Sequence, residues 1–127
     1  MILLSAAAKL IVLSALARPV NAASYSNLYG CWQRSDNKTT YPTLVVYCFK
    51  KSRMVFGWRS DNGYSFDFSG RWNLVGKNID IKFRDATQLK CKIETGNNSS
   101  EKEIKLTDCN SVNANGLYHP TTIKGIE

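Results

Sequence analysis

The chain has 127 residues, which is enough for one domain with a single core and excludes a multidomain protein. Its 17 Lys and Arg residues outnumber 10 Asp and Glu residues, so the formal net charge is +7. This balance excludes an acidic protein and favours an anionic partner over a cationic one.

The first 22 residues have the pattern of a secretory signal peptide. A single cation, Lys9, precedes an apolar run from Leu10 to Ala17, and small residues follow just before Ala23. We therefore expect a signal over residues 1–22, with cleavage before Ala23. The alternative is a membrane anchor, but the run is shorter than the roughly 20 apolar residues that span a bilayer. Removing the signal, with Lys9 and Arg18, leaves a charge of +5, and we expect a periplasmic or secreted protein.

The remaining chain carries an even number of cysteines. They are Cys31, Cys48, Cys91 and Cys109. In a small exported domain, four cysteines predict two disulfides, for which three connectivities are possible. Zinc is the competing interpretation, but no pair has the short spacing of a zinc site and the sequence contains one histidine, His119. We therefore expect no metal and no cofactor.

The stretch from Tyr64 to Phe83 predicts strands. Apolar and polar residues alternate from Tyr64 to Ser69 and again from Ile79 to Arg84, and such a period of two is typical of a strand with one buried face. The same reasoning gives eight short strands, at 28–34, 43–49, 54–59, 64–69, 71–74, 78–84, 88–94 and 103–107. We expect a β domain over residues 23–110 and a C-terminal tail over residues 111–127, and leave open whether the tail packs on the domain.

The spacing of these strands predicts an all-β fold. No segment has a helical apolar stripe long enough for a core helix. Eight strands joined by short turns indicate a small barrel or a β-sandwich. Consecutive antiparallel hairpins favour an up-and-down barrel, because a sandwich would need long crossover connections.

The first strand resembles that of lipocalins and the wider calycin group. The segment Leu28-Tyr29-Gly30-Cys31-Trp32 has their L-x-G-x-W opening, and Gly70-Arg71-Trp72 is similar to the G-x-W of small bacterial lipocalin-like domains. The resemblance implies a barrel with Trp32 plugging one end. The chain is shorter than a usual lipocalin and lacks the later Thr-Asp-Tyr signature and the C-terminal helix, which implies a shallow cup.

The faces of the strands then suggest a disulfide pairing. If Trp32 points inward, Cys31 points outward, and the first hairpin brings it opposite Cys48. Cys91 and Cys109 flank the last hairpin in the same way. We predict Cys31–Cys48 and Cys91–Cys109, and the main alternative joins Cys31 to Cys109.

The sequence offers little for catalysis. His119 lies in a tail, where an exposed residue is the simpler interpretation than a catalytic base. Asp67 and Asp80 occupy polar faces of strands, while Asp61 and Asp85 lie near turns. No acid interrupts the apolar alternation, where a raised pKa would arise. We expect a non-enzymatic protein.

The aromatic residues gather in the centre of the chain. Trp58, Tyr64, Phe66, Phe68 and Trp72 fall within fifteen residues. They could line a cavity for a small hydrophobic ligand, or simply fill a narrow barrel. We favour filling, with Trp58 or Trp72 reaching a rim.

The cations suggest a basic face. Lys82, Arg84, Lys90, Lys92 and Lys105 occupy alternate positions of the last strands, and Lys50, Lys51, Arg53 and Arg59 flank the third strand. Such a face would attract an acidic protein or an anionic glycan or lipid. The alternative is a charged surface that only protects strands. Nucleic acid fits an exported protein of modest charge poorly.

The predicted function is an exported binding module. We expect a monomer that contacts a macromolecule through its loops and its basic face, for example as an inhibitor of a lysozyme or a protease. The predicted contact residues are Lys82, Arg84, Lys90, Lys92, Trp58 and Trp72. A lipocalin-like carrier of a small hydrophobic ligand is the alternative.

Overall fold

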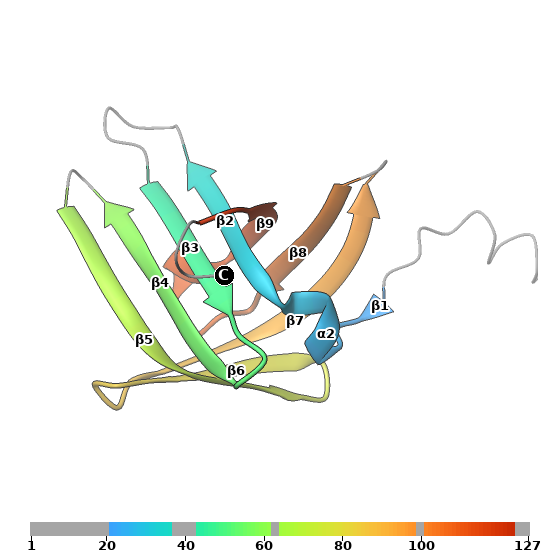
Figure 1. Ribbon diagram of the computed structural model, residues 1–127, viewed down its shortest axis with the longest axis horizontal. Helices are drawn as coiled ribbons and strands as arrows, with labels where there is room; N and C mark the ends of the chain where they lie inside the picture. Colours follow the sequence, from blue (N-terminus) through green and yellow to red (C-terminus); the bar gives the residue numbers. More distant parts are fainter. Residues whose placement is uncertain (1–20, 37–42, 62–63, 99–100, 124–127) are drawn as a thin grey trace, which may run out of the picture.

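The computed structural model describes residues 21–36, 43–61, 64–98 and 101–123. The predicted signal lies almost wholly outside the described residues. The elements, in chain order, are β1 (Asn21–Ala22), α2 (Tyr25–Leu28), β2 (Gly30–Asp36), β3 (Thr43–Phe49), β4 (Met54–Asp61), β5 (Tyr64–Val75), β6 (Asn78–Phe83), β7 (Gln88–Asn98), β8 (Glu101–Thr107), the 3-10 helix η1 (Val112–Ala114) and β9 (Gly116–Thr121) (Figure 1).

The eight strands from β2 to β9 form a closed up-and-down barrel. Each strand pairs antiparallel with the next one in the sequence. The ring closes because β9 also pairs with β2, which places Cys31 opposite Thr121. This closure confirms the predicted barrel and excludes the β-sandwich. The short β1 pairs with β7 in addition to this ring.

The barrel has eight strands as predicted, but two of the predicted strands are merged and another is added. The predicted fourth and fifth strands are one continuous strand, β5, of 12 residues. Gly70 allows this continuity, because a Cβ atom there would lie 2.1 Å from the carbonyl oxygen of Lys82 on β6. The absence of a side chain lets the two backbones approach closely.

The eighth strand of the ring comes from the predicted tail. β9 pairs with β8 on one side and β2 on the other. Tyr118 points inward and is fully buried, whereas its neighbour Leu117 is 41% exposed. The signal in the sequence was weak because Pro120 interrupts a very short alternation. Residues 116–121 therefore belong to the barrel.

A short helix, α2, covers one end of the barrel. Leu28, the last residue of α2, is fully buried, and its carbonyl oxygen accepts a hydrogen bond from Nε1 of Trp32 at 2.9 Å. Trp32 is 3% exposed and belongs to the core. Trp32 and Leu28 are therefore packed together in the core at this end of the barrel.

The core fills this covered half of the barrel. Trp72 is 1% exposed, packs 5.0 Å from Phe49 between ring centroids, and donates from Nε1 to the carbonyl oxygen of Lys50 at 3.0 Å. The Arg53 guanidinium lies 3.4 Å from the centre of the Tyr25 ring, a cation–π contact that fixes α2 against the β3–β4 turn.

Both predicted disulfides are present, and the alternative pairing of Cys31 with Cys109 is excluded. Cys31 and Cys48 lie opposite each other on β2 and β3, in an outer cluster separate from the main core. Cys91 on β7 points into the core and joins Cys109, which follows β8. Two disulfides are typical of a protein that folds outside a reducing compartment. In the described part of the chain, no helix is long and apolar enough to cross a membrane.

Candidate functional site

The barrel opens where β5 separates from β6. β5 pairs with β4 along most of its length, but its pairing with β6 begins only at Gly70. A cleft of about 940 Å³ lies between the first half of β5, the β6–β7 turn and the segment around η1. Its aromatic lining consists of Tyr47, Phe66, Phe68 and Phe83 on the inner face of the barrel, and Phe56 and Trp58 border it from the outer face of β4. The predicted filling of the barrel therefore holds for one half only.

The aromatic side chains range from buried to exposed across the cleft. Tyr47 is 5% exposed, whereas Phe66 at the rim is 57% exposed and Phe56 is 36% exposed. Phe68 links the two levels, because its ring centroid lies 5.2 Å from that of Tyr47 and 5.4 Å from that of Phe83. Large apolar side chains left this open to water are typical of a contact surface.

Two buried tyrosines lie beneath the cleft. Their rings are 5.7 Å apart between centroids. Burial raises the pKa of Tyr47 to about 12, although Arg34 and Arg59 oppose the shift. Burial also raises the pKa of Tyr118 well above its usual range. Both phenols are therefore neutral at physiological pH, and neither can act as a general base there.

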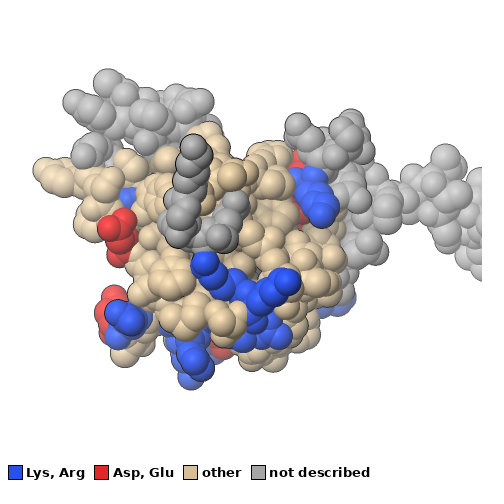
Figure 2. Space-filling model, in the orientation of Figure 1, with Lys and Arg blue, Asp and Glu red and all other residues tan. Residues whose placement is uncertain are grey.

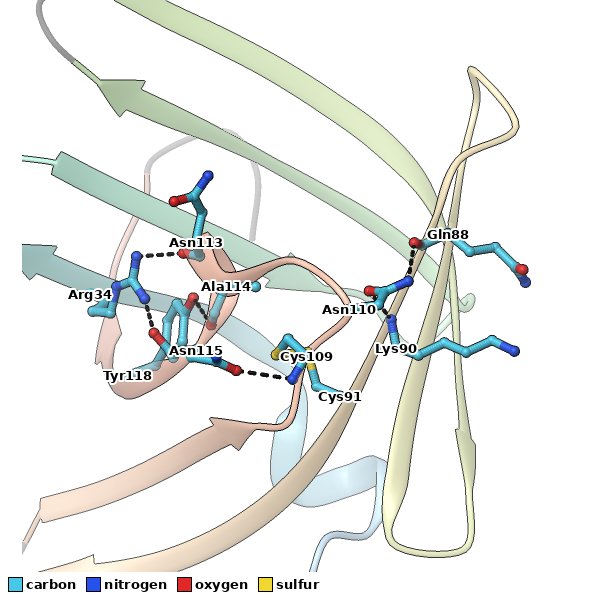
Figure 3. The surroundings of a disulfide bond; sticks show 10 residues. All are labelled: Arg34, Gln88, Lys90, Cys91, Cys109, Asn110, Asn113, Ala114, Asn115 and Tyr118. Carbon is cyan, nitrogen blue, oxygen red and sulfur yellow. Dashed lines mark hydrogen bonds between the residues drawn. A yellow bond between two sulfur atoms is a disulfide. The ribbon is translucent and has the colours of Figure 1, made fainter.

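The segment between β8 and β9 forms one wall of the cleft. The Cys91–Cys109 disulfide links the start of this segment to β7, and the next residue, Asn110, forms hydrogen bonds with the backbone of β7 (Figure 3). The Asn110 backbone N–H donates to the Lys90 carbonyl at 3.0 Å, and its side chain bonds the Lys90 N–H and the Gln88 carbonyl at 3.0 and 2.9 Å. These bonds hold the wall without a regular strand.

Arg34 holds the other end of the same wall. Its guanidinium donates to the carbonyl oxygen of Asn113 at 2.6 Å and to that of Asn115 (Figure 3). The hydroxyl of Tyr118 donates to the carbonyl oxygen of Ala114 at 2.7 Å. Sequence reasoning did not single out Arg34. Its position two residues after the inward-facing Trp32 is the signal that could have identified it, because alternate residues of a strand share a face.

The structure divides the predicted contact residues into three groups. Trp58 and Arg84 border the cleft from the outer face, where Trp58 also packs against the cluster of Cys31, Val46 and Cys48. Trp72 does not reach a rim, because it lies on the half of β5 that is covered by β6 and is 1% exposed. Lys82, Lys90 and Lys92 are exposed on the outer faces of β6 and β7, in the strands that continue from the cleft.

Two of the three lysines on β6 and β7 lie beside an acidic residue. Lys92 pairs with Asp108 at 3.3 Å, between two side chains that are mostly exposed. Lys82 faces Arg71 across the β5–β6 ladder, while Lys90 faces Asp80. Within the described residues, no ion pair involves Lys82, Arg84 or Lys90.

The predicted second group of cations is split. Lys50, Lys51 and Arg53 lie at the β3–β4 turn, where Figure 2 shows Lys and Arg gathered on the surface. Lys50 and Lys51 also line a second hollow, of about 510 Å³, beside the Cys31–Cys48 disulfide. Arg59 lies near the opposite end of β4 and lines the aromatic cleft.

His119 is not a tail residue, because it lies on β9 opposite Gln33 and is half-buried. Among the residues with described positions, no group of three or more His, Cys, Asp or Glu could hold a metal ion.

The fold and the cleft together define a small closed β-barrel with one plugged end and one open aromatic side, consistent with a calycin-type barrel. No protein-family model matches the chain, and it has no significant match among curated proteins or solved structures.

Proposed function

We propose that this chain is an exported, non-enzymatic binding protein whose site is the aromatic cleft together with the adjoining cations of β6 and β7. Its partner is a protein, and inhibition of a hydrolase is one use of such a contact. The exposed rim carries the proposal: Phe66 is 57% and Tyr64 71% exposed beside a cleft that Trp58 and Arg84 border from the outer face.

The openness of the cleft favours a macromolecular partner. A pocket for a small molecule usually buries most of its ligand. Here the aromatic rim remains accessible, and a second surface can only cover it by docking from outside. Aromatic residues and arginine are the side chains that dominate protein–protein contacts. The cations Lys82, Lys90 and Lys92 extend the contact and would speed association with an acidic surface.

The test is capture from the exported fraction of the source cells by the oxidised protein, with Phe66→Ser compared with Val75→Ser. The two residues lie on the same strand and have nearly equal exposure, 57% and 55%, but Val75 is at the opposite end of β5. We expect Phe66→Ser to lose the captured protein and Val75→Ser to keep it. Equal capture by both variants would refute a site in the cleft.

Charge reversal tests the basic part of the site. The triple variant Lys82→Glu, Lys90→Glu and Lys92→Glu should weaken capture at physiological salt, while leaving the aromatic rim unchanged. Recovery of a glycan or lipid in place of a protein would redirect the proposal to a polyanion. Undiminished capture by the triple variant would remove these lysines from the site.

A lipocalin-like carrier is the second candidate. The cleft volume of about 940 Å³ supports it, because ligand pockets span roughly 300–1,000 Å³. Native mass spectrometry of protein purified from its own compartment should then show a small bound mass that is lost on denaturation. A carrier would be contradicted if the purified protein holds no bound mass and no lipid-like compound raises its melting temperature.

A further inference from the structure

One edge of β5 is free for part of its length. From Gly70 onward the strand pairs with β6, and just before this the carbonyl oxygen of Ser69 accepts a hydrogen bond from the Arg84 N–H at 3.1 Å. β6 ends at Phe83 and the chain then turns toward β7. As a result, no described residue pairs with Tyr64–Phe68 on this side, and the free edge borders the cleft.

The hydrogen-bonding direction of each residue on this edge follows from its neighbours. The Trp72 N–H donates to the Arg53 carbonyl on the β4 side at 2.9 Å, whereas the Ser69 carbonyl points to the β6 side. Backbone groups of successive residues in a strand point to opposite sides. The N–H and C=O groups of Ser65 and Asp67 therefore point away from β4, toward the cleft.

This edge carries few of the features that keep strands apart. Natural proteins protect open edges with charged side chains, above all Lys, and with Pro or bulges. The stretch Tyr64-Ser65-Phe66-Asp67-Phe68 has no Lys and no Pro, its one charge is Asp67, and it pairs with β4 without a bulge. Its aromatic side chains alternate with the free backbone groups. Such an edge is competent to accept another strand.

We propose that the cleft binds an extended peptide segment of a partner protein, which adds to the edge of β5 as a further strand. This inference rests on the proposed function, because it uses the same cleft. A strand in this position would continue the line of β6 and satisfy the backbone groups of Ser65 and Asp67. A small ligand cannot supply donors and acceptors repeated at the spacing of a strand.

The two faces of the cleft define the sequence that would fit. On the inner face, alternate side chains of the segment contact Phe66, Phe68 and Phe83, and are therefore apolar. On the outer face, the intervening side chains lie beside Asp67 and Arg84, and are therefore polar. The occupant is an alternating apolar and polar segment, the pattern of strand addition.

The first experiment measures fluorescence anisotropy of end-blocked, labelled heptapeptides with the oxidised protein. Each peptide alternates Thr with one apolar residue, chosen from Val, Leu, Phe and Tyr. For each peptide that binds, a version N-methylated on the residues that pair with β5 keeps every side chain but loses the donors. We expect N-methylation to weaken binding about tenfold or more. Equal affinity for the two forms would overturn strand addition.

The second experiment changes the protein edge. Asp67→Pro removes the N–H that points to the cleft, and it leaves the β4 ladder intact because that N–H takes no part in it. Asp67→Ala removes only the carboxylate. We expect Asp67→Pro to weaken peptide binding about tenfold and Asp67→Ala to change it less than about threefold. Equal losses would assign the effect to the carboxylate and overturn the proposal.

The remaining outcomes are equally decisive. If Asp67→Pro does not fold, the N-methylated peptides provide the same test on the wild-type protein. A partner whose capture depends on Phe66 but not on the Asp67 N–H would leave the proposed function standing and overturn strand addition. A homodimer that is lost in Asp67→Pro would assign the edge to a second copy and also overturn it. If no peptide binds at concentrations up to about 1 mM, strand addition is also overturned.

Discussion

The Cys91–Cys109 disulfide should both stabilise the barrel and fix the wall of the cleft. The two cysteines are 18 residues apart. Closing a loop of this size in the unfolded chain is worth about 3 kcal/mol in the chain-entropy model. A domain of this length is stable by only about 5–15 kcal/mol, so Cys91→Ala with Cys109→Ala should remove a large share. Because Cys91 is buried, a small cavity cost adds to this loss.

The matched control is the other disulfide. Cys31 and Cys48 are 17 residues apart, so the entropic loss for Cys31→Ala with Cys48→Ala is also about 3 kcal/mol. Urea unfolding followed by circular dichroism measures both. The two variants should differ in hydrogen exchange at the Asn110 amide, which donates to the Lys90 carbonyl. In Cys91→Ala with Cys109→Ala, the free energy of opening at this amide should fall below the global free energy of unfolding, and in Cys31→Ala with Cys48→Ala it should not. A loss under about 1 kcal/mol, or unchanged Asn110 protection, would refute the reasoning.

Three further predictions concern buried positions of the barrel. Gly70→Ala should lower the free energy of unfolding in urea by about 1–3 kcal/mol, because the new Cβ would lie 2.1 Å from the Lys82 carbonyl oxygen. The control Gly96→Ala, whose Cβ would have no atom within 4 Å, should be nearly neutral. Equal effects of the two substitutions would contradict the close approach of β5 and β6 at Gly70. Trp72→Phe leaves the Lys50 carbonyl without its 3.0 Å donor and should cost about 1–3 kcal/mol, so a smaller change in the urea midpoint would count against that bond. Tyr47 has a pKa of about 12 in the folded state against about 10 when unfolded. Its contribution to the free energy of unfolding is therefore complete below pH 10, and it falls by about 1.4 kcal/mol per pH unit as the pH rises from 10 to 12. Urea midpoints across this range should drop less steeply in Tyr47→Phe, and parallel curves for variant and wild type would disprove the assignment.

The parts of the fold that follow from local pattern were predictable. Alternation in Ile79–Phe83 and Leu89–Ile93 identified strands and their inward faces, and the inward position of Trp32 gave the disulfide between Cys31 and Cys48. These features depend on neighbours that are close in the sequence. The pattern therefore specified the meander and one face of each strand.

The cleft was not predictable from the same pattern. The alternation of Phe66 and Phe68 marks them as inward, but it does not show that β6 stops short and leaves them open. Arg34 interrupts the inward face of β2, and its partners at Asn113 and Asn115 lie in a segment without regular pattern. Contacts across this sequence distance depend on barrel closure, which no local window contains.

Closure of the ring by β9 also has a consequence for the order of folding. The β2–β9 ladder joins Cys31 to Thr121, near opposite ends of the chain, so it can form only after most of the sequence is present. Pairings of such high sequence separation are slow, because the loop-closure entropy is lost before the contacts form. Until then, β2 and β8 each present an open edge that can pair with another chain. We therefore expect a chain truncated before Gly116 to aggregate during refolding, with light scattering that rises with protein concentration.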